Sequence, residues 1–140
     1  MSDLAVKLLA ELSRESAPGR YVVALSGGLD SIVLLHALAS LRDADSLHAE
    51  LAAVHINHQL SDMAMEWQAF CAEICQQWQV PLTTREVAVS ANGSLEAAAR
   101  AARYDAFRDL VQGGDSLLLA HHLDDQIETF LYRLLRGAGP

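Results

Sequence analysis

The sequence has few cysteines, and none of them is arranged to staple the chain. Its two cysteines, Cys71 and Cys75, stand four residues apart and do not form the C-x-x-C pair of a redox or zinc site. This spacing predicts two small, buried thiols on one face of a helix. A chain of 140 residues buries enough surface to fold as one domain without a disulfide or a structural metal.

The sequence also lacks a long apolar run and a secretory signal. Its longest apolar stretches, near residues 32–35 and 117–120, are far shorter than the roughly 20 residues of a membrane span. The N-terminus has no basic region followed by an apolar core. These absences predict a cytoplasmic protein that does not contact a membrane.

Basic residues are scarce. Ten Lys and Arg stand against 18 Asp and Glu, which gives a formal net charge of −8. A surface that binds nucleic acid tightly is expected to be basic, because Lys and Arg neutralise phosphates. The charge therefore argues against tight RNA binding by this chain alone.

Short apolar runs that favour strands alternate with segments that favour helices. The runs occupy residues 21–25, 51–56, 82–89 and 116–120, and the helical segments occupy residues 3–15, 31–41, 62–78, 94–111 and 123–136. Continuous apolar strands are typical of a parallel sheet covered on both faces. We therefore predict an α/β domain with a doubly wound, mostly parallel sheet and helices on both faces. Ligands of such sheets bind at the carboxyl ends of the strands.

The first strand is followed by a glycine pair and the start of a helix, a combination that favours phosphate binding. Glycines let the backbone approach a ligand closely, and a helix N-terminus offers free N–H groups to an anion. An aspartate here would repel a bare phosphate, so we expect Mg²⁺ to lie between the two. The sequence lacks the lysine of a Walker A loop. The predicted ATP-binding residues are Ser26, Gly27, Gly28, Leu29, Asp30 and Ser31.

This S-G-G-x-D-S motif resembles the signature of the PP-loop ATP-pyrophosphatases. The resemblance implies an adenine nucleotide alpha hydrolase-like fold and an enzyme that cleaves ATP between its α- and β-phosphates. It also implies that the loop holds the pyrophosphate part of ATP, and that Asp30 contributes to catalysis and to a Mg²⁺ site.

A second polar cluster, H-I-N-H, ends the second strand. His55 and His58 could be metal ligands, or they could cap, pack or face solvent at a strand end. The pattern H-x-N-H-x-L resembles the tRNA(Ile)-lysidine synthetases, a branch of the PP-loop enzymes. That resemblance implies that His55, Ile56 and Asn57 line the adenosine pocket.

Two arginines lie early in the fourth predicted helix. Glu96 and Arg100 could form a salt bridge on a solvated helix, or an arginine could face the cleft and bind phosphate. The pattern E-x-x-A-R-x-x-R-Y is again similar to the lysidine synthetases. It implies a catalytic role for Arg100 and, as a weaker expectation, RNA contact by Arg103.

The densest polar cluster, H-H-L-D-D-Q-I-E-T, follows the fourth strand. Carboxylates are favoured in a first helical turn, but this does not explain two neighbouring histidines. Mg²⁺ binding with proton transfer is one explanation, and a zinc site is another. The cluster resembles the lysidine synthetases, which implies catalytic roles for His121, Asp124 and Asp125, with both aspartates as candidate metal ligands.

Two further arginines, Arg133 and Arg136, precede a glycine near the end of the chain. They could be ordinary cations at a helix C-terminus. The segment R-L-L-R-G is also similar to the part of the lysidine synthetases that continues this helix toward RNA. RNA contact by both arginines is thus a weak expectation.

Together, the motifs imply ligation of L-lysine to C2 of the wobble cytidine in the minor tRNA(Ile) with a CAU anticodon. The reaction would consume ATP in the presence of Mg²⁺ and would pass through an adenylated cytidine. It would release AMP and pyrophosphate. The resemblance allows a homodimer. It also predicts that residues 1–140 form one PP-loop domain shortened at its C-terminal end, with tRNA-binding domains beyond it. The shortened chain is expected to be poorly active.

Two other functions remain open from the motifs alone. Another PP-loop enzyme that modifies tRNA or forms an amide would share the phosphate loop, but a 2-thiocytidine synthetase would need C-x-x-C pairs that the chain lacks. A non-catalytic ATP-binding module would not need the ionisable cluster after the fourth strand.

Overall fold

The computed structural model describes residues 3–14, 16–25, 29–57, 63–87, 95–120 and 129–131. Within these residues the chain alternates between helices and strands, as the sequence predicts. The elements in chain order are α1 (Asp3–Leu12), β1 (Arg20–Ala24), α2 (Leu29–Asp43), β2 (Glu50–Asn57), α3 (Ala64–Gln77), β3 (Leu82–Glu86), α4 (Leu95–Leu110), β4 (Asp115–Ala120) and β5 (Thr129–Leu131).

The strands form one sheet in the order β3-β2-β1-β4-β5. The first four run parallel, with Val23 beside Ala53 on one side and beside Leu118 on the other. Strand β5 pairs antiparallel with β4 at the edge. The predicted mostly parallel sheet is confirmed, and its central strand is β1.

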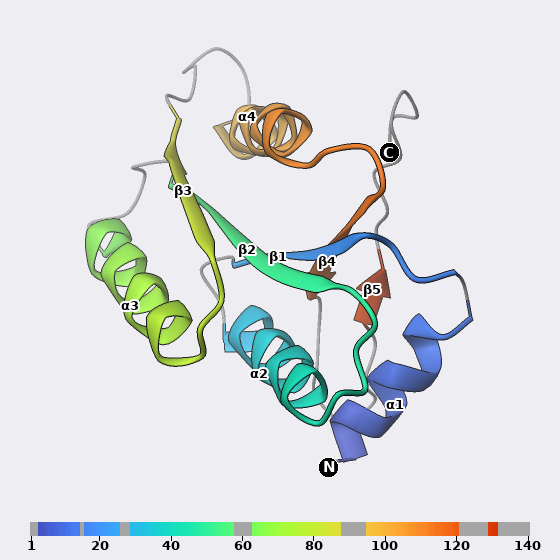
Figure 1. Cartoon of the computed structure of the whole chain (residues 1–140). Helices are drawn as coiled ribbons and strands as arrows, with labels where there is room; N and C mark the ends of the chain where they lie inside the picture. Colours follow the sequence, from blue (N-terminus) through green and yellow to red (C-terminus); the bar gives the residue numbers. More distant parts are fainter. Residues whose placement is uncertain are drawn as a thin grey trace.

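Helices cover both faces of this sheet (Figure 1). Alternate residues of β1 supply the two cores, because successive side chains of a strand point to opposite faces. Tyr21 and Val23 pack in the cluster that includes buried residues of α1, α2 and α3. Val22 and Ala24 pack in the cluster that includes Phe107 of α4. The doubly wound arrangement is therefore confirmed.

The direction of winding changes at β1. From β1 the chain passes through α2 to β2 and through α3 to β3, moving toward one edge of the sheet. It then crosses through α4, on the opposite face, to β4 on the other side of β1. The carboxyl ends of β1 and β4 thus flank the switch point where such sheets bind ligands.

One predicted element is wrong where the structure describes it. The sequence pattern predicts a helix over residues 123–136, but Thr129–Leu131 is strand β5, with Leu118 paired to Leu131 and Ala120 to Thr129. The outer edge of β4 presents unpaired backbone groups that can accept another strand. Thr129 and Phe130 are residue types that favour strands, and a short apolar run does not reveal by its period which partner it will find.

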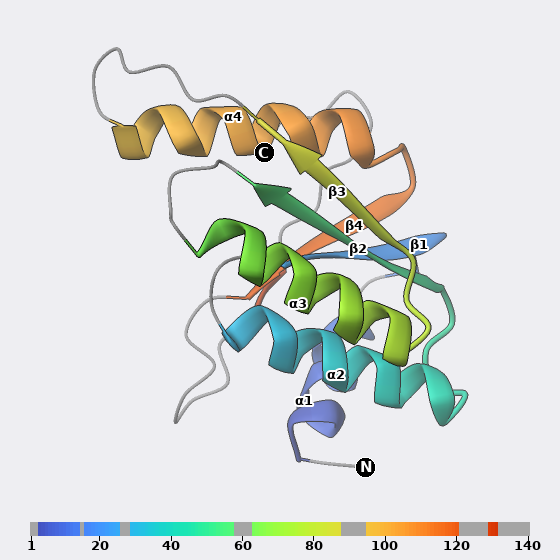
Figure 2. The same ribbon diagram turned by 90° about the vertical axis from the view of Figure 1, so that its left-hand side faces the viewer.

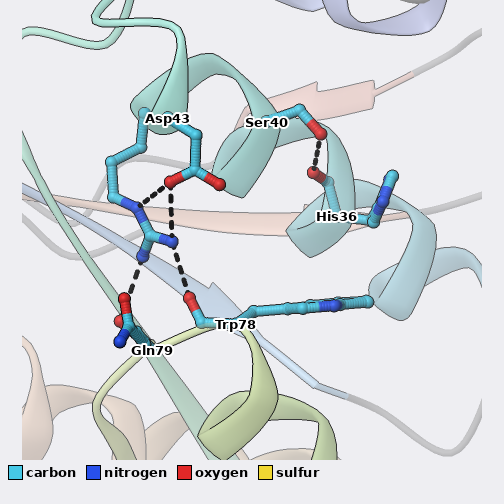
Figure 3. A network of polar contacts seen from close by, with 6 residues as sticks. His36, Ser40, Asp43, Trp78 and Gln79 are labelled. Atoms are coloured by element: carbon cyan, nitrogen blue, oxygen red, sulfur yellow. Dashed lines mark hydrogen bonds and ion pairs between the residues drawn. The ribbon is translucent and has the colours of Figure 1, made fainter.

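A guanidinium joins the C-terminal ends of α2 and α3. Arg42 donates from Nη2 to the Trp78 carbonyl at 2.6 Å and from Nη1 to the Gln79 carbonyl at 3.0 Å. It also pairs with Asp43 at 3.1 Å. Figure 3 shows these contacts, with the ring of Trp78 turned toward His36, whose ring centroid is 5.1 Å away. The network fixes the C-terminal end of α2 to that of α3, on the face of the sheet that these helices share with α1.

A second ion pair joins β1 to β4 at the amino ends of the strands. Arg20 donates to Oδ2 of Asp115 from Nη2 at 2.6 Å and from Nε at 3.2 Å. The same oxygen accepts the amide of Gln112 at 2.9 Å. Gly114, in the turn between α4 and β4, has a φ of +93°, which glycine adopts without strain.

Among the described residues, no helix is long and apolar enough to span a bilayer.

Candidate nucleotide site

The loop that carries the phosphate-binding motif connects two anchored elements. Leu25, directly after β1, is buried, and its amide donates to the Val54 carbonyl at 2.8 Å. Helix α2 begins four residues later, at Leu29, and is packed into the core by buried side chains such as Leu34 and Leu35. The predicted phosphate ligands Ser26, Gly27 and Gly28 lie outside the described residues.

The first turn of α2 carries the remaining residues of the motif. Leu29 is 69% exposed, Asp30 is half-buried and Ser31 is only 1% exposed. A carboxylate in a first turn is favoured by the helix dipole. The N-terminus of this helix, at the carboxyl end of β1, has the geometry of an anion site, and Asp30 offers the oxygen ligand that Mg²⁺ prefers.

The end of β2 is buried. His55 is 5% exposed, Ile56 7% and Asn57 2%. The ring Nδ1 of His55 lies 2.7 Å from the carbonyl oxygen of Leu25. The amide of Asn57 donates to Oε1 of Gln68 at 2.8 Å. The His55 side chain thus contacts the end of β1, and the Asn57 side chain binds α3.

Strand alternation separates the three residues of this segment. His55 and Asn57 share the face of Leu51 and Ala53, whose cluster includes α2 and α3. Ile56 lies on the other face and packs in the cluster that contains Phe107. Sequence reasoning missed Gln68, since a glutamine within an amphipathic helix gives no signal that it will meet a strand end.

The two arginines of α4 lie in its first half. Figure 2 shows that the start of α4 projects past the carboxyl ends of β2 and β3. Arg100 is exposed there, while Arg103 is half-buried with its guanidinium carbon 6.0 Å from the centroid of the Tyr104 ring. The side chain of Glu96, the proposed partner of Arg100, is not among those described.

The polar cluster after β4 and the two arginines near the end of the chain fall outside the described residues. His121, Asp124, Asp125, Arg133 and Arg136 all belong to the ranges 121–128 and 132–140, so their predicted roles stay predictions. Within the part of the chain that the structure describes, no three His, Cys, Asp or Glu side chains are grouped to hold a metal ion.

A cavity of about 220 Å³ lies near the amino ends of β1 and β2. It is lined by residues from the end of α1, the start of β1 and the segment before β2, including Leu12, Tyr21 and His48. Pockets for drug-sized ligands are usually larger, at about 300–1,000 Å³. Its place at the amino ends of the strands separates it from the candidate nucleotide site.

The fold and the helix N-terminus at the switch point define an α/β domain of the nucleotide-binding class. Comparison with known families refines this class. The family model described as the PP-loop domain matches residues 2–140, and the chain belongs to this ATP-binding PP-loop family.

Curated relatives narrow the resemblance further. The chain is 52% identical over 122 residues to the tRNA(Ile)-lysidine synthase of Edwardsiella ictaluri, an alignment that covers 86% of this chain and 28% of that protein. It is 49% identical to that of Serratia proteamaculans, with 96% of this chain and 31% of the relative covered. For Pseudomonas aeruginosa the identity is 48%, with 97% and 30% covered. The chain thus spans about 30% of the length of these relatives.

Among solved structures, the fold is similar to the U34-tRNA thiolase NcsA from Methanococcus maripaludis with its [4Fe-4S] cluster. The TM-score is 0.59 at 14% sequence identity, and the match covers 89% of this chain and 48% of the thiolase. At this identity the likeness supports the fold alone.

Proposed function

We propose that this chain is the ATP-using domain of a tRNA(Ile)-lysidine synthetase. The observation that carries the proposal is the identity of about 50% to three such synthases over 86–97% of this chain. In this reaction ATP adenylates the C2 oxygen of the wobble cytidine in the minor tRNA(Ile), whose anticodon is CAU. The ε-amine of L-lysine then displaces AMP. A tRNA substrate also favours action in the cytoplasm, without a membrane.

The phosphate loop is assigned to the pyrophosphate part of ATP. Ser26, Gly27, Gly28 and Ser31 would offer N–H and hydroxyl donors at the N-terminus of α2, where the helix dipole favours negative charge. This arrangement would stabilise charge on the departing pyrophosphate. Leu29 belongs to the same loop through its backbone.

Asp30 and one of the two neighbours Asp124 and Asp125 are assigned to Mg²⁺. Asp30 lies in the first turn of α2. Asp124 and Asp125 follow β4, the strand that pairs with β1, in the sequence. Oxygen ligands of this kind fit a hard cation. When bound, Mg²⁺ would neutralise phosphate charge.

The remaining predicted residues surround this centre. His55, Ile56 and Asn57 are assigned to the wall of the adenosine pocket, and Arg100 to a phosphate. The lysine amine must lose a proton, for which His121, Asp124 and Asp125 are the candidates. Contacts to tRNA are assigned to Arg103, Arg133 and Arg136.

A thiolation reaction is the competing function within the PP-loop family, and the cysteines argue against it. The chain contains two cysteines, both buried on α3. Burial raises the pKa of Cys75 to about 11 and that of Cys71 to about 12. A ligand to a metal cluster must be a thiolate, so this pair is poorly suited to hold one.

Lysine incorporation tests the proposal. Labelled lysine, ATP and Mg²⁺ are incubated with the minor tRNA(Ile) and either this chain or the longest natural version of it. We expect the longer protein to label the tRNA and to release AMP and pyrophosphate, and Asp30→Ala to lose at least about a hundredfold in rate, as for removal of a group that stabilises developing charge. ATP binding by the longer protein without label in this tRNA would point to another PP-loop substrate.

A further inference from the structure

The last carbonyl of β1 is held by an imidazole. Leu25 continues the parallel ladder with its amide, which donates to Val54 at 2.8 Å. In a continued ladder, the Leu25 carbonyl would accept the amide of Ile56. Here its oxygen lies 2.7 Å from Nδ1 of His55. Because a carbonyl can only accept, Nδ1 must carry the proton in this hydrogen bond.

This contact is buried and directional. His55 is 5% exposed and Leu25 is 2% exposed, so water competes little for either group. The neighbouring polar side chain on the same face of β2, Asn57, already donates to Gln68. His55, by contrast, donates to β1 through the Leu25 carbonyl.

Its position matters because Leu25 is the residue before the loop. The next three residues are Ser26, Gly27 and Gly28 of the phosphate-binding motif. On the far side, α2 is fixed by buried leucines. Holding the Leu25 carbonyl fixes the peptide group that leads from β1 toward the motif, and a group that is fixed before binding loses less conformational entropy when a ligand binds.

We propose that His55 is a positioning residue for the phosphate loop, and that it acts on ATP affinity through Nδ1 and the Leu25 carbonyl. This inference rests on the proposed ATP site and gives His55 a defined task within it. In this role the ring nitrogen Nε2 is not the group on which binding depends.

Substitution by asparagine or glutamine distinguishes the roles of the two ring nitrogens. The side-chain amide nitrogen of Asn lies near the position of Nδ1, and that of Gln lies near the position of Nε2. We expect His55→Asn to retain more ATP affinity than His55→Gln or His55→Ala, because only Asn keeps a donor near the position of Nδ1. His55→Gln and His55→Ala should each weaken ATP binding about tenfold, which corresponds to about 1.4 kcal/mol. ATP binding is measured by titration on both this chain and its longest natural version, with melting curves recorded to confirm folding.

The exposed His48, which precedes β2 at the amino ends of the strands, provides matched controls. His48→Asn and His48→Gln should bind ATP like the wild type. Rescue by Gln at position 55, or equal weakening by Asn and Gln, would overturn the positioning role, since direct contact through Nε2 or a purely steric role would then explain the data. Wild-type affinity in all three His55 variants would also overturn it.

Nuclear magnetic resonance tests the hydrogen bond between His55 and the Leu25 carbonyl independently of ATP. The ¹⁵N shifts of the His55 ring should show a proton on Nδ1, and the ¹³C shift of the Leu25 carbonyl should move in His55→Gln but stay in His55→Asn. A ring protonated only on Nε2 contradicts the inference. If this hydrogen bond is present but the wild-type protein binds no ATP, the proposed function is wrong, and so is the role of His55 in ATP affinity. The structural contact between His55 and Leu25 would still be confirmed.

Discussion

At the scale of single residues, burial controls the chemistry of the cysteines. Cys71 and Cys75 lie one turn apart on α3 and are 0% and 2% exposed. Loss of hydration raises the pKa of Cys71 from 9.0 to about 12, with a further contribution from the charge of Cys75, and raises that of Cys75 to about 11. Buried thiols of this kind are inert, because the thiolate is the reactive form.

The raised pKa values predict a loss of stability in alkali. Above pH 9 the unfolded chain releases these protons while the folded chain keeps them, so the free energy of unfolding falls as pH rises from 9 toward 11. Each thiol contributes a slope of up to about 1.4 kcal/mol per pH unit. Urea unfolding at several pH values should therefore show a steeper loss for the wild type than for the Cys71→Ala/Cys75→Ala variant. Parallel curves would contradict burial of both thiols.

Asp115 illustrates how burial changes the contribution of an ion pair to the free energy of unfolding. Its side chain is 10% exposed and accepts from Arg20 and from the Gln112 amide. We expect Asp115→Ala to lower the free energy of unfolding by about 2–3 kcal/mol, because charge-assisted hydrogen bonds are lost and a partly buried guanidinium is left unpaired. The exposed pair of Asp105 and Arg108 is the control, and Asp105→Ala should change stability by less than about 0.5 kcal/mol. Equal effects in urea unfolding would refute this distinction.

At the scale of elements, Arg42 shows how one side chain fixes two helices. Two nitrogens of its guanidinium reach two carbonyls at the C-terminal end of α3, while its own helix is α2. A lysine ammonium cannot reproduce this fork. The contact lies far from the N-terminal ends of both helices, where the candidate site is.

We predict that Arg42→Lys loosens the end of α3 without abolishing the fold. The free energy of unfolding should fall by about 1 kcal/mol, and amide hydrogen exchange should quicken in the last turn of α3. Arg14→Lys, at an exposed pair with Glu11, is the matched control and should change neither quantity. Unchanged exchange in α3 for the Arg42 variant would show that packing alone holds the two helices.

The β5 segment shows a limit of local pattern at this same scale. The pattern around residues 123–136 favours a helix, yet Thr129–Leu131 pairs with β4. The deciding factor is the unpaired edge of another strand, which lies in a different part of the sequence. No window around residue 130 contains that information.

At the scale of the whole molecule, charge limits what the chain can do alone. A net charge of −8 repels the phosphates of tRNA, while the chain spans about 30% of the length of its curated relatives. We predict that this chain binds Mg-ATP weakly, binds tRNA(Ile) more weakly than about 10 μM near physiological salt, in the range of non-specific binding, and makes little or no lysidine. Fluorescence anisotropy and the lysine assay check this. Submicromolar tRNA affinity, or turnover like that of a longer version, would contradict it.

The sequence by itself determined the order of helices and strands from α1 to β4, the two-sided sheet and the positions of the motifs in the chain relative to the strands. These follow from local signals: apolar runs for buried strands, periodicity for helices, and S-G-G-L-D-S at a strand-to-helix turn. It placed the start of the following helix at Ser31, and the structure begins that helix two residues earlier, at Leu29. Family resemblance, rather than residue pattern, supplied the substrate.

Only the tertiary structure decided how these pieces meet. The sequence could not say that His55 turns toward Leu25 and Asn57 toward Gln68, because the facing of a strand end depends on which elements cover each side of the sheet. Nor could it place β1 in the centre, between β2 and β4. Those outcomes depend on contacts between residues distant in sequence, such as the 2.7 Å contact across 30 positions from His55 to Leu25, which no local pattern encodes.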